Sequence, residues 1–149
     1  DFVSVKDNAK VNGIEISPSS GSAPAPAPTP APSGGTDLAI NAGGPATGGF
    51  SADAFFFGGN TYTTGSSIAG TSEDKLYQSE RWGNFKYSVG LENGTYDVTL
   101  KFAEIYMNGA GQRLFDVKGE NKLLLDNFDV YAAAGVASKA LTSFSTKKP

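Results

Sequence analysis

Apolar and polar residues alternate along residues 96–102 (YDVTLKF), which is typical of a β-strand that buries one face. The segment KYSVG before it also has β character, and the Asn93-Gly94 dipeptide between them is a strong signal for a tight turn. The pattern therefore predicts a β-hairpin across residues 86–106. Further β-type runs, expected to form strands, occur at residues 10–16, 37–44, 112–119 and 123–136.

The composition favours an all-β fold. Nineteen glycines, ten phenylalanines and six tyrosines fall in short runs between turn residues. Residues 55–62 (FFFGGNTY) lie in a loop-rich stretch, and only residues 137–144 (ASKALTSF) have weak helical character. We therefore expect an antiparallel β-sandwich of the jelly-roll type. Because residues 55–57 are three adjacent aromatics, at least one of their rings should face away from the core.

Residues 18–36 (PSSGSAPAPAPTPAPSGGT) have the composition of a linker. Alternating Ala-Pro fixes φ and offers no large apolar side chain, so an extended, polyproline-like chain is expected. Such linkers join the modules of secreted bacterial polysaccharide-active proteins. The predicted organisation is a short segment over residues 1–17, the linker over residues 18–36, and a sandwich domain over residues 37–149.

The segment before the linker contains one evident strand, KVNGIEI, which follows a turn at DNAK. A lone strand is not stable by itself. It must belong to a domain further upstream or pair with strands downstream. The chain starts at DFVSV without an initiating Met and ends without a tail-like sequence, so we expect a fragment of a longer polypeptide, in which the lack of a signal peptide is uninformative.

The charge and the missing residue types exclude several classes of function. A net charge of -3 and a pI near 4.8 argue against nucleic-acid binding. No apolar run approaches the roughly twenty residues of a membrane-spanning helix. The chain has no Cys and no His, which excludes thiol nucleophiles, Ser-His catalysis and the usual zinc sites. No metal ion or cofactor is expected.

Glu104 interrupts the strand pattern, because it falls where the alternation places a core residue. An ionised and unpaired carboxylate in a core is strongly destabilising. Arg81 and Arg113 are the two arginines of the chain, and both lie near aromatic, glycine-bearing turns. We expect Glu104 to support a loop through an ion pair with one of them. A ligand-binding or catalytic role for Glu104 is the alternative.

Two aromatic residues lie at positions suited to binding rather than to packing. Tyr106 ends its strand beside the residues MNGA, a loop that is not expected to cover it, and Trp82 lies between a charged residue and a glycine. Flat aromatic faces stack on the C–H faces of sugar rings, while neighbouring polar groups reach the sugar hydroxyls. The alternative is that these rings plug the end of the sandwich.

Five segments, taken in order, resemble the malectin domain, a carbohydrate-binding module: AINAGG, LYQSERWGNFKYSV, NGTYDVTLKFAEIY, GQRLFDV and LLLDNFDVYAAAGVASKA. The resemblance covers residues 38 to about 144, and ENGTYDVTLKFAEIY followed by RLFDV is its most specific part. It implies a β-sandwich with a ligand site formed by aromatic residues on loops at one end. It also implies non-catalytic binding of an oligosaccharide or polysaccharide, with a glucan-type ligand suspected.

The resemblance implies four ligand-binding positions after the linker. The aromatic after the SER-type arginine is Trp82, and the pair that closes the FAE strand is Tyr106 and Met107. The animal members have a second aromatic where Met107 stands, so that position keeps an apolar, polarizable contact but loses a stacking face. A further family tyrosine falls within residues 57–62, and Tyr62 is favoured.

The remaining family ligand residue is an aspartate in a DNPK-like turn before the last strand. Here that pattern is KDNAKVNGIEI, so Asp7 corresponds to it, at the opposite end of the chain. The simplest interpretation is a tandem arrangement, with the tail of one malectin-type domain, a linker, and a truncated second domain. In the alternative, the N-terminal strand completes the downstream sandwich as in a circular permutant. The linker permits this, because nineteen residues at about 3.1 Å each exceed the width of such a domain.

Two other functions remain open. Glycoside hydrolysis would need two carboxylates, with Glu80 and Glu104 as candidates, about 5 to 10 Å apart across an open cleft. The third alternative is a structural spacer or a protein-binding module of a surface protein. In each case the expected location is extracellular or on a cell surface, as part of a larger and bacterial protein with neighbouring domains in the same polypeptide.

Two minor motifs have simpler explanations. Asn93-Gly94-Thr95 matches a glycosylation sequon but is already explained as a turn. Four aspartates could in principle hold calcium through oxygen ligands: Asp53, Asp116, Asp126 and Asp129. Their spacing lacks a loop signature, so solvated or capping roles are favoured.

Overall fold

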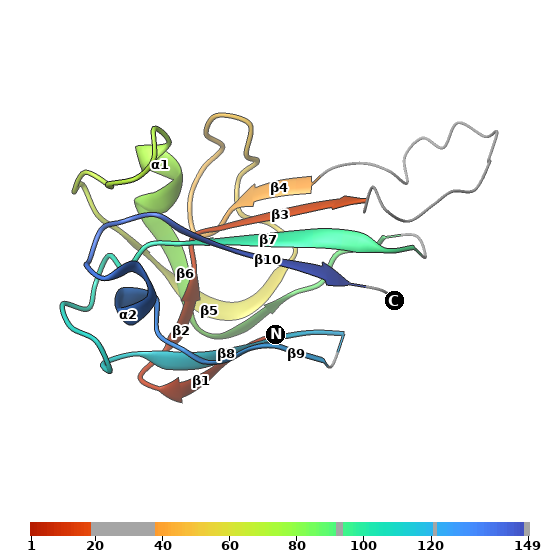
Figure 1. Ribbon diagram of the computed structural model, residues 1–149. Coiled ribbons are helices and arrows are strands. Elements are labelled where there is room, and N and C mark those ends of the chain that lie inside the picture. The colour runs from red at the N-terminus through yellow and green to blue at the C-terminus, as the bar shows by residue number, and fades with distance from the viewer. Residues whose placement is uncertain (19–37, 92–93, 121, 148–149) are drawn as a thin grey trace.

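The chain folds into two antiparallel β-sheets packed face to face, with two short helices (Figure 1). This computed structural model describes residues 1–18, 38–91, 94–120 and 122–147, with side chains up to residue 142. The predicted β-sandwich is therefore confirmed. One sheet has six strands, in the order β2 (Ala9–Val11), β6 (Ser79–Tyr87), β1 (Phe2–Lys6), β8 (Leu114–Gly119) and β9 (Lys122–Phe128), with β5 (Phe56–Thr63) also paired to β6.

The second sheet has four strands, in the order β10 (Leu141–Lys147), β7 (Tyr96–Phe102), β3 (Gly13–Pro18) and β4 (Leu38–Asn41). Figure 1 shows this sheet as the upper layer, above β8, β9 and β1. The register of β3 against β7 places Ile14 opposite Leu100 and Ile16 opposite Val98. Directly opposed residues share a face of the sheet, so these four side chains form one apolar surface toward the core.

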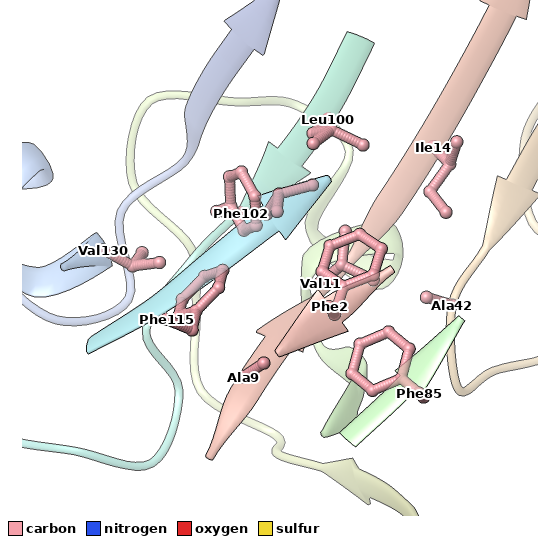
Figure 2. Close-up of a cluster of buried hydrophobic side chains, with 11 residues drawn as sticks. Phe2, Ala9, Val11, Ile14, Ala42, Phe85, Leu100, Phe102, Phe115 and Val130 are labelled. Carbon is pink, nitrogen blue, oxygen red and sulfur yellow. The ribbon is translucent and has the colours of Figure 1, made fainter. Parts of the chain in front are cut away.

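The core between the sheets includes Leu100 and Phe102, which the alternation along residues 96–102 places on one face. The stacked rings of Phe2 and Phe85, with centroids 4.6 Å apart, join β1 to β6 within it. Phe102 and Phe115 meet across the two sheets, with ring centroids 5.9 Å apart. Figure 2 shows the cluster, whose members are Phe2, Ala9, Val11, Ile14, Ala42, Phe85, Leu100, Phe102, Phe115, Val117 and Val130.

The segment before the linker forms three strands rather than the single strand expected. β1 and β2 belong to the six-stranded sheet and β3 to the four-stranded sheet. The chain changes sheet at Asn12, whose buried side chain donates to the carbonyl oxygens of Tyr77 and Ser79 and accepts from the N–H of Ala103. Each of these three strands pairs with strands that follow residue 37. In this structure the N-terminal segment is thus part of the same sandwich, while the division of the parent polypeptide into domains stays a prediction.

The hairpin predicted across residues 86–106 is wrong. β6 and β7 lie in different sheets, because β6 already pairs with β5 on one side and with β2 and β1 on the other. β7 pairs instead with β3 and β10. The turn signal Asn93-Gly94 therefore lies in a connection between sheets, and Asn93, with its sequon, lies outside the described residues.

Residues 55–62 are not loop-rich, since β5 runs through them as a strand. Gly58 and Gly59 both have positive φ (84° and 83°), and the register with β6 shifts between Gly58 and Asn60. Glycine is needed there because other residues rarely adopt such a φ. All three rings of residues 55–57 are exposed, which agrees with the expectation that at least one leaves the core.

The helices also differ from the expectation. Residues 141–147 form β10, whereas α2 (Val130–Ala134) lies within a stretch expected to be a strand. Asp129 caps α2 by accepting from the N–H of Ala132, and Gly135, with φ of 87°, ends it. An aspartate and a glycine flanking VYAAA are helix start and stop signals that the strand interpretation overlooked. Neither helix among the described residues is long and apolar enough to cross a membrane.

A second apolar cluster supports the loop that follows β7. It contains Phe50, Ile68, Leu76, Tyr77, Ala103 and Ile105, with Leu76 and Tyr77 contributed by α1 (Asp74–Tyr77). Ala103 and Ile105 are buried in it, while Tyr106 is 64% exposed. The cluster therefore fixes the path of residues 103–106 and presents Tyr106 at the surface.

Candidate functional site

Two tyrosines, one on a strand and one on a loop, meet at the surface above this cluster. Tyr62 lies on β5 and Tyr106 on the loop after β7. Their ring centroids are 5.3 Å apart with an interplanar angle of 85°, an edge-to-face arrangement. Tyr106 is largely exposed and Tyr62 partly so. The two rings form an aromatic wall that is open to solvent.

Trp82 lies on the same face of the sheet as Tyr62. In the β5–β6 register, Tyr62 is opposite Glu80 and Asn60 is opposite Trp82. Glu80 and Trp82 are two residues apart on β6, so their side chains share a face. Such diagonal neighbours are separated by about 7–8 Å, within reach of large aromatic side chains. Trp82 is half-buried and therefore presents only part of its indole.

A buried ion pair underlies the aromatic residues. Lys10 is opposite Trp82 on β2, and its Nζ lies 2.7 Å from Oε1 of Glu80. The ammonium also donates to the carbonyl oxygen of Ala103, at the start of the Tyr106 loop. Lys10 and Glu80 are 0% and 1% exposed. The sequence analysis did not predict this pair. The available signal was the place of Lys10 between the apolar residues Ala9 and Val11, because a lysine buried there would need an acidic partner.

Glu104 is fully buried and forms the ion pair expected for it, with Arg113. Nε of Arg113 donates to Oε1 of Glu104 at 2.8 Å. The other carboxylate oxygen accepts the backbone N–H groups of Tyr106 (3.2 Å) and Met107 (3.1 Å). A charge-assisted contact to a guanidinium and two backbone donors offset the cost of burial. Glu104 thus holds the loop that carries Tyr106 and the half-buried Met107.

Asp7 is brought to the same region by the other end of Arg113. Nη1 of Arg113 donates to the carbonyl oxygen of Asn8 at 2.7 Å. Asp7, the residue before Asn8, is exposed and has φ of 61° in the turn between β1 and β2. Its Oδ1 accepts from the side-chain amide of Asn8 at 2.8 Å. The turn with Asp7 and the loop with Tyr106 are therefore both attached to one guanidinium.

Arg81 has a different role from the one considered for it. Its Nε lies 2.9 Å from Oδ2 of Asp53, so Arg81 pairs with Asp53 and not with Glu104. The guanidinium lies over the ring of Phe56 at 3.5 Å from the centroid. The hydroxyl of Tyr87 donates a hydrogen bond to Oδ1 of Asp53 at 2.7 Å. Burial is the main cause that raises the pKa of Tyr87, and this hydrogen bond adds to it. This network ties the loop with Asp53 to β6.

The chemistry of the site favours binding over acid–base catalysis. Glu80 and Glu104, the carboxylates that hydrolysis would need, are both buried and engaged with Lys10 and Arg113. Neither carboxylate is a free acid or base at an open cleft, so Glu80 and Glu104 do not form the carboxylate pair that glycoside hydrolysis needs. In contrast, the exposed ring of Tyr106 and the exposed carboxylate of Asp7 present an aromatic face and hydrogen-bonding groups to solvent.

The four aspartates considered for calcium do not come together. Within the described part of the chain, no three acidic, His or Cys residues gather as a metal site would require. Asp129 caps α2, and Asp116 accepts from the N–H of Asn127 at 2.8 Å. Asp126 accepts from the side chain of Asn127, and Asp53 pairs with Arg81. Their contacts fit capping and turn-stabilising roles.

A cavity of about 530 Å³ lies elsewhere, between the two sheets. Its walls include core residues such as Ile14, Leu100 and Val117, with Asp1 and Lys118 at the edge. None of the five residues expected to bind the ligand lines this cavity. The candidate site is thus a surface formed by two strands, a loop and a turn, rather than an enclosed pocket.

Comparison with known proteins identifies the family of the chain. Residues 36–147 match the malectin domain. A kinesin-like protein, KIN-14E, from Oryza sativa subsp. japonica is 42% identical over 114 residues, covering 66% of this chain and 11% of that protein. A probable LRR receptor-like serine/threonine-protein kinase from Arabidopsis thaliana is 38% identical over 84 residues, covering 49% of this chain and 8% of the kinase.

The similarity extends to animal malectin. Malectin from Mus musculus is 36% identical over 72 residues, which cover 46% of this chain and 25% of the mouse protein. The chain therefore spans a quarter of the mouse protein and 11% or less of the two plant proteins. No solved structure matches the chain. Because the malectin match extends over most of the sequence, the chain belongs to the malectin domain family, whose members are non-catalytic carbohydrate-binding modules.

Proposed function

We propose that this chain binds a glucan-type oligosaccharide through Tyr62, Trp82, Tyr106, Met107 and Asp7. The observation that carries the proposal is the meeting of Tyr62 and Tyr106, 5.3 Å apart and open to solvent, on the face that Trp82 shares. A sugar ring would stack on these aromatic side chains. Asp7 would accept hydrogen bonds from sugar hydroxyls, and Met107 would add an apolar contact.

The polar groups of the site are suited to this ligand. No hydrogen bond joins the hydroxyls of Tyr62 and Tyr106 or the indole N–H of Trp82 to another described residue. These groups can therefore bond to a ligand without breaking internal contacts. The affinity should be modest, because an open sugar site buries little surface and competes with water for each hydroxyl.

The module would act within a larger protein, outside the cell or at its surface. A receptor-like kinase among the similar proteins is consistent with a surface location. A bacterial origin stays a prediction, since the similar proteins reported above come from plants and mouse. The enzymatic status of the whole polypeptide is not part of this proposal.

A glycan array probed with the purified chain tests the proposal. We expect saturable binding to glucose-containing oligosaccharides, and loss of binding in Trp82→Ala and in Tyr106→Ala with unchanged circular dichroism. Leu123→Ala is the matched control, because Leu123 is 51% exposed on β9, which lies away from the site. If the folded wild type binds no glycan, the alternative of a spacer or protein-binding module is favoured.

A further inference from the structure

The face that carries Tyr62 and Trp82 continues along β5 and β6 beyond the site described above. Trp82, Asn84 and Lys86 are alternate residues of β6 and therefore project from the same side. On β5, Asn60 is opposite Trp82 and Phe57 is opposite Lys86. The register shift between Gly58 and Asn60 places Phe57 and Asn60 on this one face, although three residues separate them.

Phe57 is an exposed aromatic at the far end of this face. Its side chain is 59% exposed, more than any other phenylalanine among the exposed large hydrophobic residues. The ring contacts the ammonium of Lys86, whose Nζ lies 5.5 Å from the ring centroid. β5 is an edge strand that pairs only with β6, so no neighbouring strand covers it within the described residues. Because the Phe57 side chain is largely exposed, its ring can contact a ligand.

The polar groups beside Phe57 can bind sugar hydroxyls. Asn60, Asn84 and Lys86 are all exposed. Oδ1 of Asn84 accepts the backbone N–H of Ser4 at 2.9 Å, which orients the amide and leaves its NH₂ group as a donor. An aromatic ring flanked by an amide and an ammonium repeats the combination of stacking and hydrogen-bonding groups found around Tyr62.

The distance along the strand determines what kind of ligand could use both places. Trp82 and Lys86 are four residues apart on β6, and their partners Asn60 and Phe57 are three residues apart on β5, which corresponds to about 10–13 Å at about 3.3 Å per residue of strand. A single sugar ring cannot contact both ends of this span, but an extended oligosaccharide can. Because the two ends lie on one continuous face, a linear chain could follow the strands without crossing another element.

We propose that Phe57 and Lys86 form a second subsite for the same linear glucan chain that occupies the site around Tyr62, Trp82 and Tyr106. Phe57 stacks on a sugar ring, while Lys86 and Asn84 donate hydrogen bonds to its hydroxyls. This inference rests on the proposed function and adds that the ligand is a chain of several units lying along β5 and β6. The Arg81–Asp53 pair behind Phe56 holds this part of the sheet in place.

Isothermal titration calorimetry with short and long glucans tests the second subsite. The probes are maltose and maltohexaose, cellobiose and cellohexaose, and laminaribiose and laminarihexaose. In the series that binds, we expect the hexasaccharide to bind more tightly than the disaccharide. Phe57→Ala should weaken hexasaccharide binding by roughly 2- to 10-fold, the value of one aromatic contact, and leave disaccharide binding unchanged. Lys86→Gln should give a smaller loss of the same kind.

The controls separate this proposal from the proposed function. Trp82→Ala should lose both ligands, and Leu123→Ala should lose neither. If Phe57→Ala binds the hexasaccharide as the wild type does while Trp82→Ala loses it, the second subsite is excluded and the first site stands. If Phe57→Ala weakens the disaccharide equally, Phe57 supports the fold rather than a subsite. If the folded wild type binds neither length in any series, both proposals fail together.

Sedimentation of the wild type and of Phe57→Ala tests whether this face instead makes a contact between protein molecules. We expect both to be monomers at the concentrations used for calorimetry. A wild-type dimer that Phe57→Ala abolishes, with equal hexasaccharide affinity in the two proteins, would assign Phe57 to self-association and overturn the subsite.

Discussion

Arg113 connects Glu104 to the turn that bears Asp7, with Nε 2.8 Å from the Glu104 carboxylate and Nη1 2.7 Å from the Asn8 carbonyl oxygen. Through Glu104, the same guanidinium supports the backbone of Tyr106 and Met107. Two parts of the proposed ligand site, one before the linker and one after it, are therefore positioned by a single side chain. The relative placement of Asp7 and Tyr106 depends on this arginine.

Arg113→Met should lower the free energy of unfolding by about 3–5 kcal/mol, because it leaves the Glu104 carboxylate buried without its cation. Urea denaturation monitored by circular dichroism measures the loss. Glu15→Gln is the control, since Glu15 is 3.7 Å from Lys101 in a pair with a 43% exposed carboxylate, and should change stability by less than about 1 kcal/mol. Equal effects of the two substitutions would contradict the role assigned to Arg113.

Gly43→Ala should destabilise the protein by more than about 2 kcal/mol. Gly43 has φ of 76°, and a Cβ there would lie 2.1 Å from the carbonyl oxygen of Glu80 on β6. Gly49→Ala is the matched control in the same loop, because a Cβ at Gly49 meets nothing within 4 Å. It should stay within about 0.5 kcal/mol of the wild type. Thermal unfolding of the two variants compares them directly.

Tyr87 should make stability fall at high pH. Burial and the hydrogen bond to Asp53 raise the pKa of Tyr87, whereas in the unfolded chain the phenol loses its proton near pH 10. Above that pH the folded state retains a proton that the unfolded state has released, so the free energy of unfolding decreases as pH rises. Below about pH 10 the contribution of Tyr87 is fully present.

Urea midpoints measured at pH 8 and at about pH 11 test this dependence. Tyr87→Phe should lose less stability between the two pH values than the wild type does, although its stability at pH 8 is lower because Asp53 loses a donor. Tyr131→Phe, which removes a partly exposed phenol from α2, is the matched control. An unchanged pH profile in Tyr87→Phe would contradict the prediction.

The fluorescence of Trp82 can be used to follow ligand binding, because Trp82 is the only tryptophan in the chain. A sugar that stacks on the half-buried indole should reduce quenching by acrylamide and shift the emission to shorter wavelength. Titration of the wild type with the binding oligosaccharide measures both effects. In Tyr106→Ala the shift should be absent at the same ligand concentrations. A shift that persists there would place the ligand away from the Tyr62–Tyr106 wall.

Local sequence patterns were informative where one sheet face is buried. The alternation in β7 predicted which residues face the core, because side chains of a strand project to opposite sides in turn. Pairing was not predictable in the same way. Asn93-Gly94 favours a hairpin by local criteria, but β6 pairs with β5 on one side and with β1 and β2, from before the linker, on the other. Local turn chemistry carries no information on such competition.

In the candidate site, too, the sequence predicted some contacts and not others. Glu104 could be assigned a cationic partner because the chain offers only two arginines, and the burial of a carboxylate demands one. The partner of Lys10 could not be assigned, since several acidic residues were equally plausible and Glu80 lies 70 positions away. Arg81 was considered for Glu104 but pairs with Asp53, which had been interpreted as a solvated carboxylate.

The pairing of Ile16 with Leu38 makes β3 and β4 adjacent antiparallel strands, although the Pro-rich segment separates them in the sequence. Neighbouring strands of this kind need only a short turn to join them. The length of that segment is therefore not imposed by the sheet it connects. An engineer could replace it by a tight reverse turn and obtain a smaller version of the molecule, or could cut it and use the two pieces as a split reporter whose reassembly restores the proposed sugar site.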